Sequence, residues 1–396
     1  MAVADILPRR DEPRANRPTG WRVVHVVRQF WPSIGGLEEV VLKLSLKQQQ
    51  LYGFAPTVVT LDRLFTDRRR RLPRTERVRD LPVIRIAWHG SHRYPIAPGV
   101  LRYIRDADIV QVHGVDFFFD FLAWTRPLHR RPLVASTHGG FFHTSFAASL
   151  KEAYFKFVTP MSCRRYDAIV ASSDEDAALF QRVAAANLHT IINGVDTDKF
   201  ADSASLQHRR SLIYFGRLAP HKRIPTIFAL LRELRREEPD WRLTIAGGEW
   251  QTSAGELRAA AAAAEVVDAV EFVREPSDPE LRALIGRSSY FVCASAYEGF
   301  GVAAVEALAA GLIPILSAIP PFVKLLERAG VGLGYDPDEP QNAAARLNRF
   351  ARCAAANLGS WRKRAMESAA IYDWSAAAES FTALYRAVLA RRRRGS

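Results

Sequence analysis

Residues Tyr290–Ala307 have the sequence YFVCASAYEGFGVAAVEA, in which a short apolar run is followed by a glycine-containing loop and then by a helical segment. The run Tyr290–Cys293 is typical of a strand buried on both faces of a parallel sheet. Glycines in the loop permit a tight turn, and Glu306 falls about two turns into the helix that follows. A strand, a loop and a helix in this order are the repeating unit of a doubly wound sheet, so this stretch predicts an α/β fold.

The same alternation recurs along the chain on both sides of this stretch. In the first half the predicted strands are Arg22–Val27, Thr57–Leu61, Val83–Ala87, Ile109–His113, Leu133–Ser136, Ala168–Ser172 and Thr190–Ile192. In the second half they are Leu212–Phe215, Arg242–Ala246, Glu271–Val273, Tyr290–Cys293 and Ile313–Ser317. The segment Ala201–His208, which is polar and poor in helix formers, separates the two series. The sequence therefore predicts two doubly wound, Rossmann-like domains that face each other across a cleft, with ligands at the carboxyl ends of the strands.

The predicted domains meet near residue 205. Residues 1–20 form a polar N-terminus that we expect to be disordered, 21–205 the first domain and 206–372 the second. Residues 373–396 form a helix, Trp374–Ala390, and a basic tail. One face of this helix is apolar, with Phe381, Leu384, Tyr385 and Val388. We expect that face to dock on the first domain.

Composition excludes several classes of protein. Of the 396 residues, 48% are apolar and 24% charged, which excludes disordered and collagen-like chains. The three cysteines, Cys163, Cys293 and Cys353, form no C-x-x-C pair, so neither a disulfide framework nor a cysteine zinc site is expected. No apolar run approaches the roughly 20 residues that span a bilayer, and residues 1–20 lack the apolar core of a signal peptide. These features favour a cytoplasmic protein.

The excess positive charge is concentrated in two segments. The net charge is +13, and Arg63–Arg79, with eight arginines against Asp67 and Glu76, supplies +6 of it, while Arg391–Arg394 supplies +4. Such patches suggest a polyanionic partner, either anionic lipid or nucleic acid. No zinc finger, RNP signature or helix-turn-helix accompanies them, which favours lipid over nucleic acid. The alternative is a solvated loop and a frayed tail.

A pair of glycines, Gly35 and Gly36, follows the first predicted strand in the segment PSIGGLEE, residues 32–39. At such a turn the backbone can approach a ligand, and the amino end of the next helix offers N–H groups to a phosphate. The alternative is a tight turn without a ligand. The segment is not the G-x-G-x-x-G fingerprint, and G-x-x-x-x-G-K-[ST] is absent, so hydride transfer and P-loop hydrolysis lose support.

Charged residues follow two strands of the second half. Arg217 and Lys222 come after Leu212–Phe215 and can neutralise a diphosphate leaving group, unless both are ordinary surface charges. Glu298 in the glycine loop and Glu306 in the helix are acceptor-only groups suited to diols. The alternative for these two, a helix cap and a solvated side chain, suits Glu306 poorly because its neighbours are apolar.

These motifs occur together in one known family. E-G-F-G-x-x-x-x-E at Glu298–Glu306, G-R-x-x-x-x-K at Gly216–Lys222 and I-N-G-V-D at Ile192–Asp196 resemble the retaining glycosyltransferases of family four, which have the GT-B fold. In the first half, VHVVRQFWPSIGGLEEVVL (24–42), YPIAPGV (94–100) and STHGGFFHT (136–144) look like the bacterial α-1,3-mannosyltransferases of xanthan and acetan assembly. The resemblance covers residues 21–390.

The resemblance implies a role for each candidate residue on the donor side. Arg217 and Lys222 would hold the donor diphosphate, and Glu306 would hold the ribose. Glu298 would bind the sugar hydroxyls, together with the amides of Gly299, Phe300 and Gly301. Gly35 and Gly36 would approach the phosphates.

The resemblance also singles out a histidine in the first half. His138, which follows Leu133–Ser136, matches the active-site histidine that such enzymes place beside the transferred sugar. His113, at the end of its own strand, is a weaker candidate. Arg223 stands where the family often has glycine.

The resemblance further implies the reactants. Such enzymes move mannose from GDP-mannose to the cellobiosyl unit of a polyprenyl-diphosphate-linked acceptor at the inner face of the cell membrane, where an anionic surface would bind the basic segments. No cofactor is expected, and Arg217 and Lys222 make a metal ion unnecessary. The Asp-x-Asp pairs Asp106/Asp108, Asp196/Asp198 and Asp336/Asp338 suit turn and capping roles.

Some alternatives stay open. The donor or the acceptor could differ from those of the xanthan-type enzymes, and a nucleotide-sugar epimerase of the same fold would need no acceptor. The phenylalanines Phe117–Phe119, Phe141 and Phe142 either contact the acceptor's sugar or prenyl chain or pack in the core.

Overall fold

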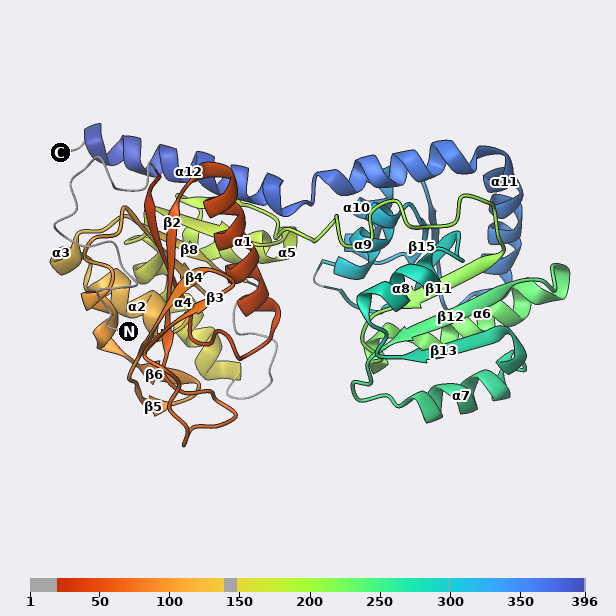
Figure 1. Cartoon of the computed structure of the whole chain (residues 1–396), viewed down its shortest axis with the longest axis horizontal. Coiled ribbons are helices and arrows are strands. Elements are labelled where there is room, and N and C mark those ends of the chain that lie inside the picture. The colour runs from red at the N-terminus through yellow and green to blue at the C-terminus, as the bar shows by residue number, and fades with distance from the viewer. Residues whose placement is uncertain (1–19, 139–147, 299, 395–396) are drawn as a thin grey trace. The chain divides into compact units, whose positions relative to one another are not determined.

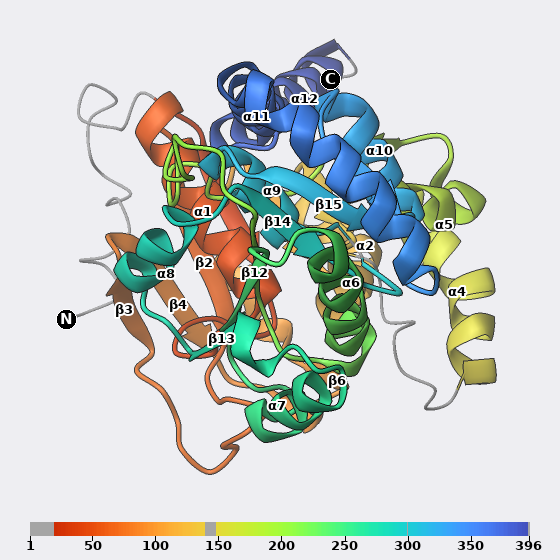
Figure 2. The same ribbon diagram turned by 90° about the vertical axis from the view of Figure 1, so that its right-hand side faces the viewer.

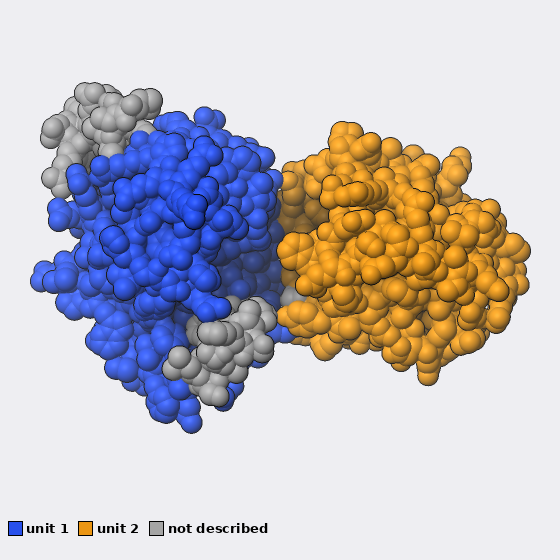
Figure 3. Space-filling view, turned by 90° about the horizontal axis from the view of Figure 1, so that it is seen from below, with its two compact units in different colours: residues 1–194, 374–396 blue, residues 195–373 orange. Residues whose placement is uncertain are grey.

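The computed structural model describes residues 20–138, 148–298 and 300–394. The segment predicted to be disordered, apart from Gly20, lies outside the described residues, as do Phe141, Phe142 and Gly299. The chain divides into two compact units, residues 1–194 with 374–396 (unit 1) and residues 195–373 (unit 2), which Figure 3 colours separately. The chain first passes from unit 1 to unit 2 between Gly194 and Val195. The sequence predicted this junction later in the chain, near residue 205.

Unit 1 is built on an eight-stranded sheet with the order β10-β9-β8-β7-β1-β2-β4-β3. Its strands are β1 (Arg22–Val26), β2 (Ala55–Leu61), β3 (Thr75–Val78), β4 (Leu81–Ile86), β7 (Ile109–His113), β8 (Leu133–Ser136), β9 (Ala168–Ala171) and β10 (Leu188–Thr190). All neighbours are parallel except β3 and β4. The parallel strands are apolar along most of their length because helices cover both faces of such a sheet.

The strand order reverses at β1. From β1 the chain builds outward through β2 and β4, and it then returns to place β7 on the other side of β1, with Val26 opposite Val112. Ligands of doubly wound sheets bind beyond the carboxyl ends of the strands at such a reversal. His25 and His113 lie at these strand ends.

The helices of unit 1 include the last helix of the chain. They are α1 (Gly36–Tyr52), α2 (Phe117–Trp124), α3 (Arg126–His129), α4 (Ala148–Cys163), α5 (Asp174–Ala184) and α12 (Trp374–Arg394). Helix α12 packs against α1 (Figure 1). Its apolar face, which includes Phe381 and Tyr385, is buried in one cluster with Val23, Leu44 and Ile109. The predicted docking of the C-terminal helix on the first domain is confirmed.

Unit 2 contains a six-stranded parallel sheet with the order β13-β12-β11-β14-β15-β16. Its strands are β11 (Ser211–Phe215), β12 (Arg242–Gly247), β13 (Val270–Arg274), β14 (Tyr290–Cys293), β15 (Ile313–Ser317) and β16 (Leu333–Tyr335). Its helices are α6 (Ile224–Glu237), α7 (Ala254–Ala263), α8 (Asp278–Ile285), α9 (Val302–Ala310), α10 (Pro320–Ala329) and α11 (Pro340–Ala370). Helix α11 packs against α6 and α10 (Figure 2). Here the strand order reverses between β11 and β14.

Each strand predicted from the sequence is present, with small shifts at the ends, and the predicted α/β class is confirmed. The strands that the sequence did not predict are short or lie at edges: β3, β16 and the hairpin of β5 (His89–Ser91) and β6 (Tyr94–Ile96). These segments carry glycine, proline or charged residues and therefore lack the apolar run that marks a buried strand.

Candidate active site

Two glycines hold the carboxyl end of β11 close to β12. Gly216 has a φ of +140°, which favours glycine, and its N–H donates to Ala246 O at 3.1 Å. A Cβ on Gly247 would lie 1.8 Å from Gly216 O, so no larger residue fits there. This approach fixes the backbone from which Arg217 extends.

The side chain of Arg217 is exposed and lies over an aromatic ring. Its guanidinium carbon is 5.6 Å from the centroid of the Trp250 ring, and Trp250 is itself 55% exposed. Tyr214 Oη donates to Arg217 O at 2.7 Å and so holds the backbone of the loop that follows β11. Because stacking occupies only the face of the guanidinium, its N–H edge remains for an anion.

Lys222 and Glu298 form an ion pair at the point where the strand order of unit 2 reverses. Lys222 ends a 3-10 turn, Pro220–Lys222, that follows β11, and Glu298 follows the neighbouring strand β14. Only 15% of the Lys222 side chain and 13% of the Glu298 side chain are exposed. Ser295 Oγ donates to Glu298 Oε1 at 2.7 Å and fixes the carboxylate. Two sequence-predicted residues are thus brought together at the ligand-binding edge of this sheet.

His221 lies at the same edge, although no sequence pattern singled it out. Its pKa is lowered by burial and further by Lys222 and Arg217, whereas Glu298 raises it. Three of the predicted charged residues therefore lie near enough to His221 to shift its pKa. His221 O accepts from Ala296 N at 2.8 Å and ties the loop after β11 to the loop after β14.

The glycine loop ends at a position that only glycine fits. Gly301 has a φ of +83° and precedes the first residue of α9, and a Cβ there would lie 2.6 Å from the Phe322 ring. Phe300 is half-buried and packs against Tyr372, with ring centroids 5.4 Å apart. The loop is therefore positioned so that N–H groups at the start of α9 are available to a ligand. Gly299 lies outside the described residues.

Glu306 is half-buried within α9. Burial raises its pKa to about 7, and Lys199 opposes this shift. Among the described residues, no hydrogen bond or ion pair engages its carboxylate. A desolvated carboxylate without a partner is well suited to accept hydrogen bonds from a diol.

The paired glycines of unit 1 stand at the start of α1, where Gly35 is the N-cap and Gly36 the first residue of the helix. Gly35 is extended, with a φ of −162°. A Cβ on Gly36 would meet nothing within 4 Å. Neither backbone conformation nor packing demands glycine at position 36, so the open space there stays available to a ligand.

His138 follows β8 and has a left-handed backbone, with a φ of +51°. Such a conformation is uncommon in residues other than glycine, and it is often found at functional sites. His138 Nε2 is 3.1 Å from His113 Nδ1, so both candidate histidines of unit 1 lie together. Burial lowers the pKa of His138 to about 4, although Asp176 opposes the shift, so the imidazole is neutral at pH 7.

A buried carboxylate next to this edge was missed by the sequence reasoning. Asp116 caps α2, accepting from Phe118 N at 2.8 Å, and its Oδ2 is 3.0 Å from Arg28 Nε. Burial raises the pKa of Asp116 to about 6, and Arg28 opposes the shift. The residue stands three positions after His113, and its only sequence signal is that of an ordinary helix cap.

The structure also decides two minor questions. Phe117, Phe118 and Phe119 are buried in the core of unit 1, so packing explains them. Two of the Asp-x-Asp pairs bond to the backbone: Asp108 accepts from Arg22 N at 2.8 Å, and Asp336 accepts from Asp338 N at 2.9 Å. Within the part of the chain that the structure describes, no group of three or more His, Cys, Asp or Glu side chains is placed to hold a metal ion.

Two family models match adjoining parts of the chain. Residues 34–199 match the model described as Glycosyltransferase Family 4, and residues 195–367 match the model described as Glycosyl transferases group 1.

Relatives among the curated proteins include two that are named GDP-mannose:cellobiosyl-diphosphopolyprenol alpha-mannosyltransferase. The one from Komagataeibacter xylinus is 46% identical over 93% of this chain and 94% of its own length. The one from Xanthomonas campestris is 44% identical over 93% of this chain and 97% of its own length.

Solved structures share the architecture at low sequence identity. A glycosyltransferase from Rickettsia africae has a TM-score of 0.70 at 15% identity and covers 94% of this chain and 99% of its own. Sucrose-phosphate synthase from Thermosynechococcus elongatus has a TM-score of 0.66 at 19% identity and covers 94% and 100%. These likenesses show the fold alone.

Proposed function

The chain is a glycosyltransferase of family four with the GT-B fold, and we propose that it transfers α-mannose, with retention, from GDP-mannose to the cellobiosyl unit of a polyprenyl-diphosphate-linked acceptor. The observation that carries the proposal is the identity of 46% and 44% to two relatives with that printed activity, over almost the whole of each protein. The xanthan-type resemblance of the first half points the same way.

The charges at the end of β11 support the binding of a donor diphosphate. When the bond from the sugar C1 to the phosphate oxygen breaks, negative charge collects on the leaving diphosphate. Arg217 offers a fork of N–H donors and Lys222 a half-buried point charge, and both are fixed before the reaction by Trp250 and Glu298. Cations preorganised in this way stabilise developing charge without reorganisation.

Glu298 and Glu306 support the binding of the hydroxyl groups of the donor. Ser295 holds one oxygen of Glu298, and Lys222 lies beside the same oxygen, so the second carboxylate oxygen remains for a sugar hydroxyl. Glu306, whose carboxylate is engaged by no described residue, would accept from the ribose hydroxyls. The amide at Gly301 would add a donor to the sugar site.

A retaining transfer can proceed here without a protein nucleophile. The bond from C1 to the diphosphate breaks, the acceptor oxygen bonds to C1 on the same face, and the acceptor proton passes to the departing phosphate oxygen. His138 is neutral at pH 7 because its pKa is lowered to about 4, so it would orient a hydroxyl of the sugar rather than supply a positive charge. In this mechanism the residues of the site only position the reactants and neutralise the leaving group.

We further propose that unit 1 attaches peripherally to an anionic membrane surface. Within the described ranges, no helix has both the length and the apolar content to cross a bilayer. Arg68–Arg71 are exposed beside the β5–β6 hairpin, on which Tyr94 and Ile96 are 42% and 47% exposed. Arg68 donates to Gly90 O at 3.0 Å, which joins the basic loop to this hairpin. Basic and apolar side chains on one surface are typical of interfacial attachment.

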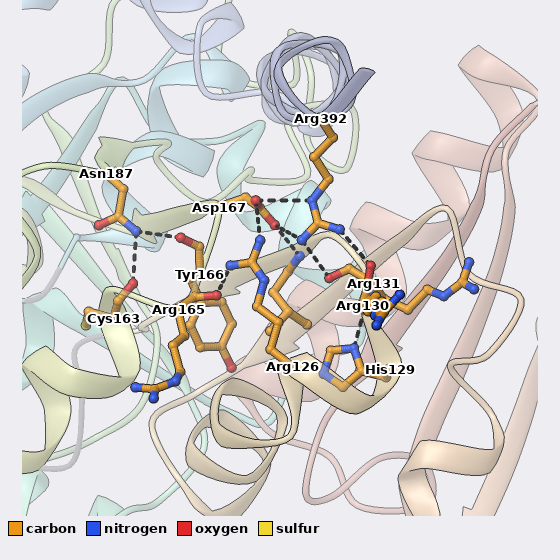
Figure 4. Close-up of polar contacts among 11 residues, drawn as sticks. Arg126, His129, Arg130, Arg131, Cys163, Arg165, Tyr166, Asp167, Asn187 and Arg392 are labelled. Atoms are coloured by element: carbon orange, nitrogen blue, oxygen red, sulfur yellow. Dashed lines mark hydrogen bonds and ion pairs between the residues drawn. The ribbon is translucent and has the colours of Figure 1, made fainter. Parts of the chain in front are cut away.

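A second basic surface lies where α12 meets α3 (Figure 4). Arg126 and Arg392 share the carboxylate of Asp167, at 2.6 Å and 3.2 Å, and Arg392 also donates to Arg130 O at 2.7 Å. Together with Arg165 these arginines line a hollow of about 330 Å³. One carboxylate cannot neutralise them, so the hollow is positive. Arg392 fastens the helix, whereas Arg393 and Arg394 are exposed.

A transfer assay tests the proposed reaction. Membranes that contain cellobiosyl-diphosphate polyprenol would receive labelled GDP-mannose, UDP-glucose or UDP-glucuronate in parallel, each with EDTA. We expect label to enter the lipid fraction from GDP-mannose alone. Release of labelled sugar without acceptor, or transfer from another donor, would overturn the proposed substrate pair while leaving the family intact.

Vesicle sedimentation tests the membrane proposal. Each arginine near an anionic surface contributes about 1 kcal/mol, so changing Arg68–Arg71 to Ser should weaken binding to phosphatidylglycerol vesicles at least tenfold. Changing Arg393 and Arg394 to Ser tests the second surface. The matched control replaces Arg235 and Arg236, which lie on α6 of unit 2. If both unit 1 variants sedimented with the vesicles as well as the unaltered protein does, the membrane proposal would be overturned.

A further inference from the structure

Three imidazoles form a row across three neighbouring strands of unit 1. His25 lies in β1, His113 ends β7 and His138 follows β8. His25 Nδ1 is 3.0 Å from His113 Nε2, and His113 Nδ1 is 3.1 Å from His138 Nε2. The ring planes of the two adjacent pairs are inclined by only 27° and 21°, and the ring centroids are 5.3 Å apart in each pair. The row leads from the buried interior of the unit to the ligand-binding edge of the sheet.

The inner end of the row is anchored by two helices. His25 Nε2 is 3.1 Å from Gln48 Oε1 of α1, and Gln48 Nε2 donates to Tyr385 Oη of α12 at 3.2 Å. Tyr385 Oη in turn donates to Gln111 Oε1 of β7. Gln111 Nε2 donates to Ser136 Oγ at 2.9 Å. The structure thus turns the oxygen of the Gln48 amide toward His25 and its nitrogen toward the hydroxyl of Tyr385.

This anchor gives the row a direction. A neutral imidazole has one N–H and one lone pair, so each ring donates at one nitrogen and accepts at the other. Gln48 Oε1 can only accept, so the proton of His25 lies on Nε2 and its Nδ1 accepts from His113 Nε2–H. By the same rule, His113 Nδ1 accepts from His138 Nε2–H. The nitrogen that remains without a proton is His138 Nδ1.

We propose that Gln48, acting through His25 and His113, fixes His138 as the Nε2–H tautomer, so that His138 Nδ1 accepts a hydrogen bond from a hydroxyl of the bound sugar. The identity of the ligand rests on the proposed function. The tautomer itself follows from the hydrogen bonds of unit 1 and does not depend on that function. His25, His113 and Gln48 are then positioning residues, because they act on the substrate only through His138.

The surroundings keep the row neutral, as the direction requires. Burial lowers the pKa of His25 to about 4 and that of His113 well below its usual value. Protonating either ring would turn its accepting nitrogen into a second donor that faces another N–H. No described residue bonds to His138 Nδ1, and Asp176, whose charge acts on this ring, is itself held by Ser172 N at 2.9 Å. A neutral row therefore keeps the direction that the oxygen of Gln48 sets at His25.

Histidine-selective ¹⁵N labelling of the full chain reads the tautomer directly. The chain has 10 histidines, and comparison with His138→Asn assigns the resonances of His138. Long-range ¹H–¹⁵N correlation should show a protonated Nε2 and an unprotonated Nδ1 on this ring at pH 7. A protonated Nδ1 in the unaltered protein would overturn the inference.

A matched set of variants tests the control by Gln48. Gln48→Met removes the acceptor for His25 at nearly constant volume, and it should give both tautomers of His138 and about a tenfold lower kcat, with KM for the donor within twofold. Gln48→Glu keeps an acceptor for His25 and should restore the single tautomer. Ser45→Ala is the control, because Ser45 is buried on the same helix and its Oγ has no partner in the described structure.

The readouts separate the two proposals. A single Nε2–H tautomer in Gln48→Met, with thermal unfolding unchanged, would show that Gln48 does not set the row and would overturn the inference. Should Gln48→Met unfold, Tyr385→Phe tests the same link, because it removes the hydroxyl that orients the Gln48 amide. A tautomer shift with kcat unchanged would overturn the role in transfer. A protein without mannosyl transfer would refute the proposed function, and the spectra would still test the tautomer.

Discussion

At the scale of single residues, Lys222 is a shielded positive charge that is held by an ion pair with Glu298. A lysine that is mostly shielded from water needs a partner, and Glu298 supplies one in the absence of the donor. Removing either partner leaves the other charge uncompensated in a half-buried site. The pair therefore joins the residue proposed to bind the donor diphosphate to the loop that carries the glutamate proposed to bind the sugar.

We expect Lys222→Gln to lower kcat by about 10² to 10³, because one preorganised cation at a developing charge has that order of effect. Initial rates at saturating GDP-mannose measure it. Arg235→Gln, which removes a positive charge from α6, should leave the rate within twofold. A Lys222→Gln enzyme with the unaltered kcat would exclude the leaving-group role.

Glu306 predicts a pH dependence of donor binding. Burial raises its pKa to about 7, so the carboxylate is protonated below that pH and ionised above it. Only the ionised form accepts hydrogen bonds with both oxygens, so KM for GDP-mannose should fall as the pH rises from 6 to 8. Glu306→Gln should remove this trend. A slope that persists in Glu306→Gln would assign the titration to another group.

At the scale of elements, the entry of α12 into unit 1 depends on one close contact. Gly194 is the last residue of unit 1 before the chain enters unit 2, and Trp374, where the chain returns to unit 1, begins α12. A Cβ on Gly194 would lie 2.4 Å from the Trp374 ring. The I-N-G-V-D motif, which the sequence showed only as a family signature, thus has a packing reason for its glycine.

Gly194→Ala should therefore destabilise the protein by about 1–3 kcal/mol, the usual cost of overfilling a packed site. Urea unfolding measures the change. Gly359→Ala is the control with the opposite sign: a Cβ there meets nothing within 4 Å inside α11, and alanine is favoured over glycine in a helix by up to about 1 kcal/mol. Equal stability of the two variants would contradict the packing argument.

At the scale of the whole molecule, the division into units does not follow the order of the chain. Unit 1 takes its last helix from the far end of the sequence, and that helix covers Val23, Leu44 and Ile109. Unit 2 is continuous from Val195 to Asp373. The two units therefore differ in whether a simple fragment of the chain contains the complete core.

Residues 195–373 expressed alone should fold and bind GDP, as circular dichroism and calorimetry would show. Residues 20–194 alone should aggregate, because the surface under α12 is exposed. Joining 374–394 to that fragment through a flexible linker should restore a cooperative thermal transition. A soluble, cooperatively folding 20–194 fragment would show that α12 is dispensable for unit 1.

Sequence by itself determined the parts of this protein that depend on local pattern. Apolar runs between helices predicted the parallel strands, because burial on both faces of a sheet demands such runs. Motif spacing identified Arg217, Lys222, Glu298 and Glu306 as candidates, because residues after parallel strands collect at one edge. The resemblance then supplied the family, which the relatives confirm.

Tertiary structure alone decided what depends on residues distant in the chain. No motif marks His25, Gln48 or Tyr385 in the sequence, and only the folding of β1, α1 and α12 joins them through hydrogen bonds. Asp116 likewise has the sequence of a helix cap, and its burial beside Arg28 follows from packing. A local pattern records whether a residue is apolar and where a turn falls, but the energy of a buried polar group depends on the partner that the fold brings to it.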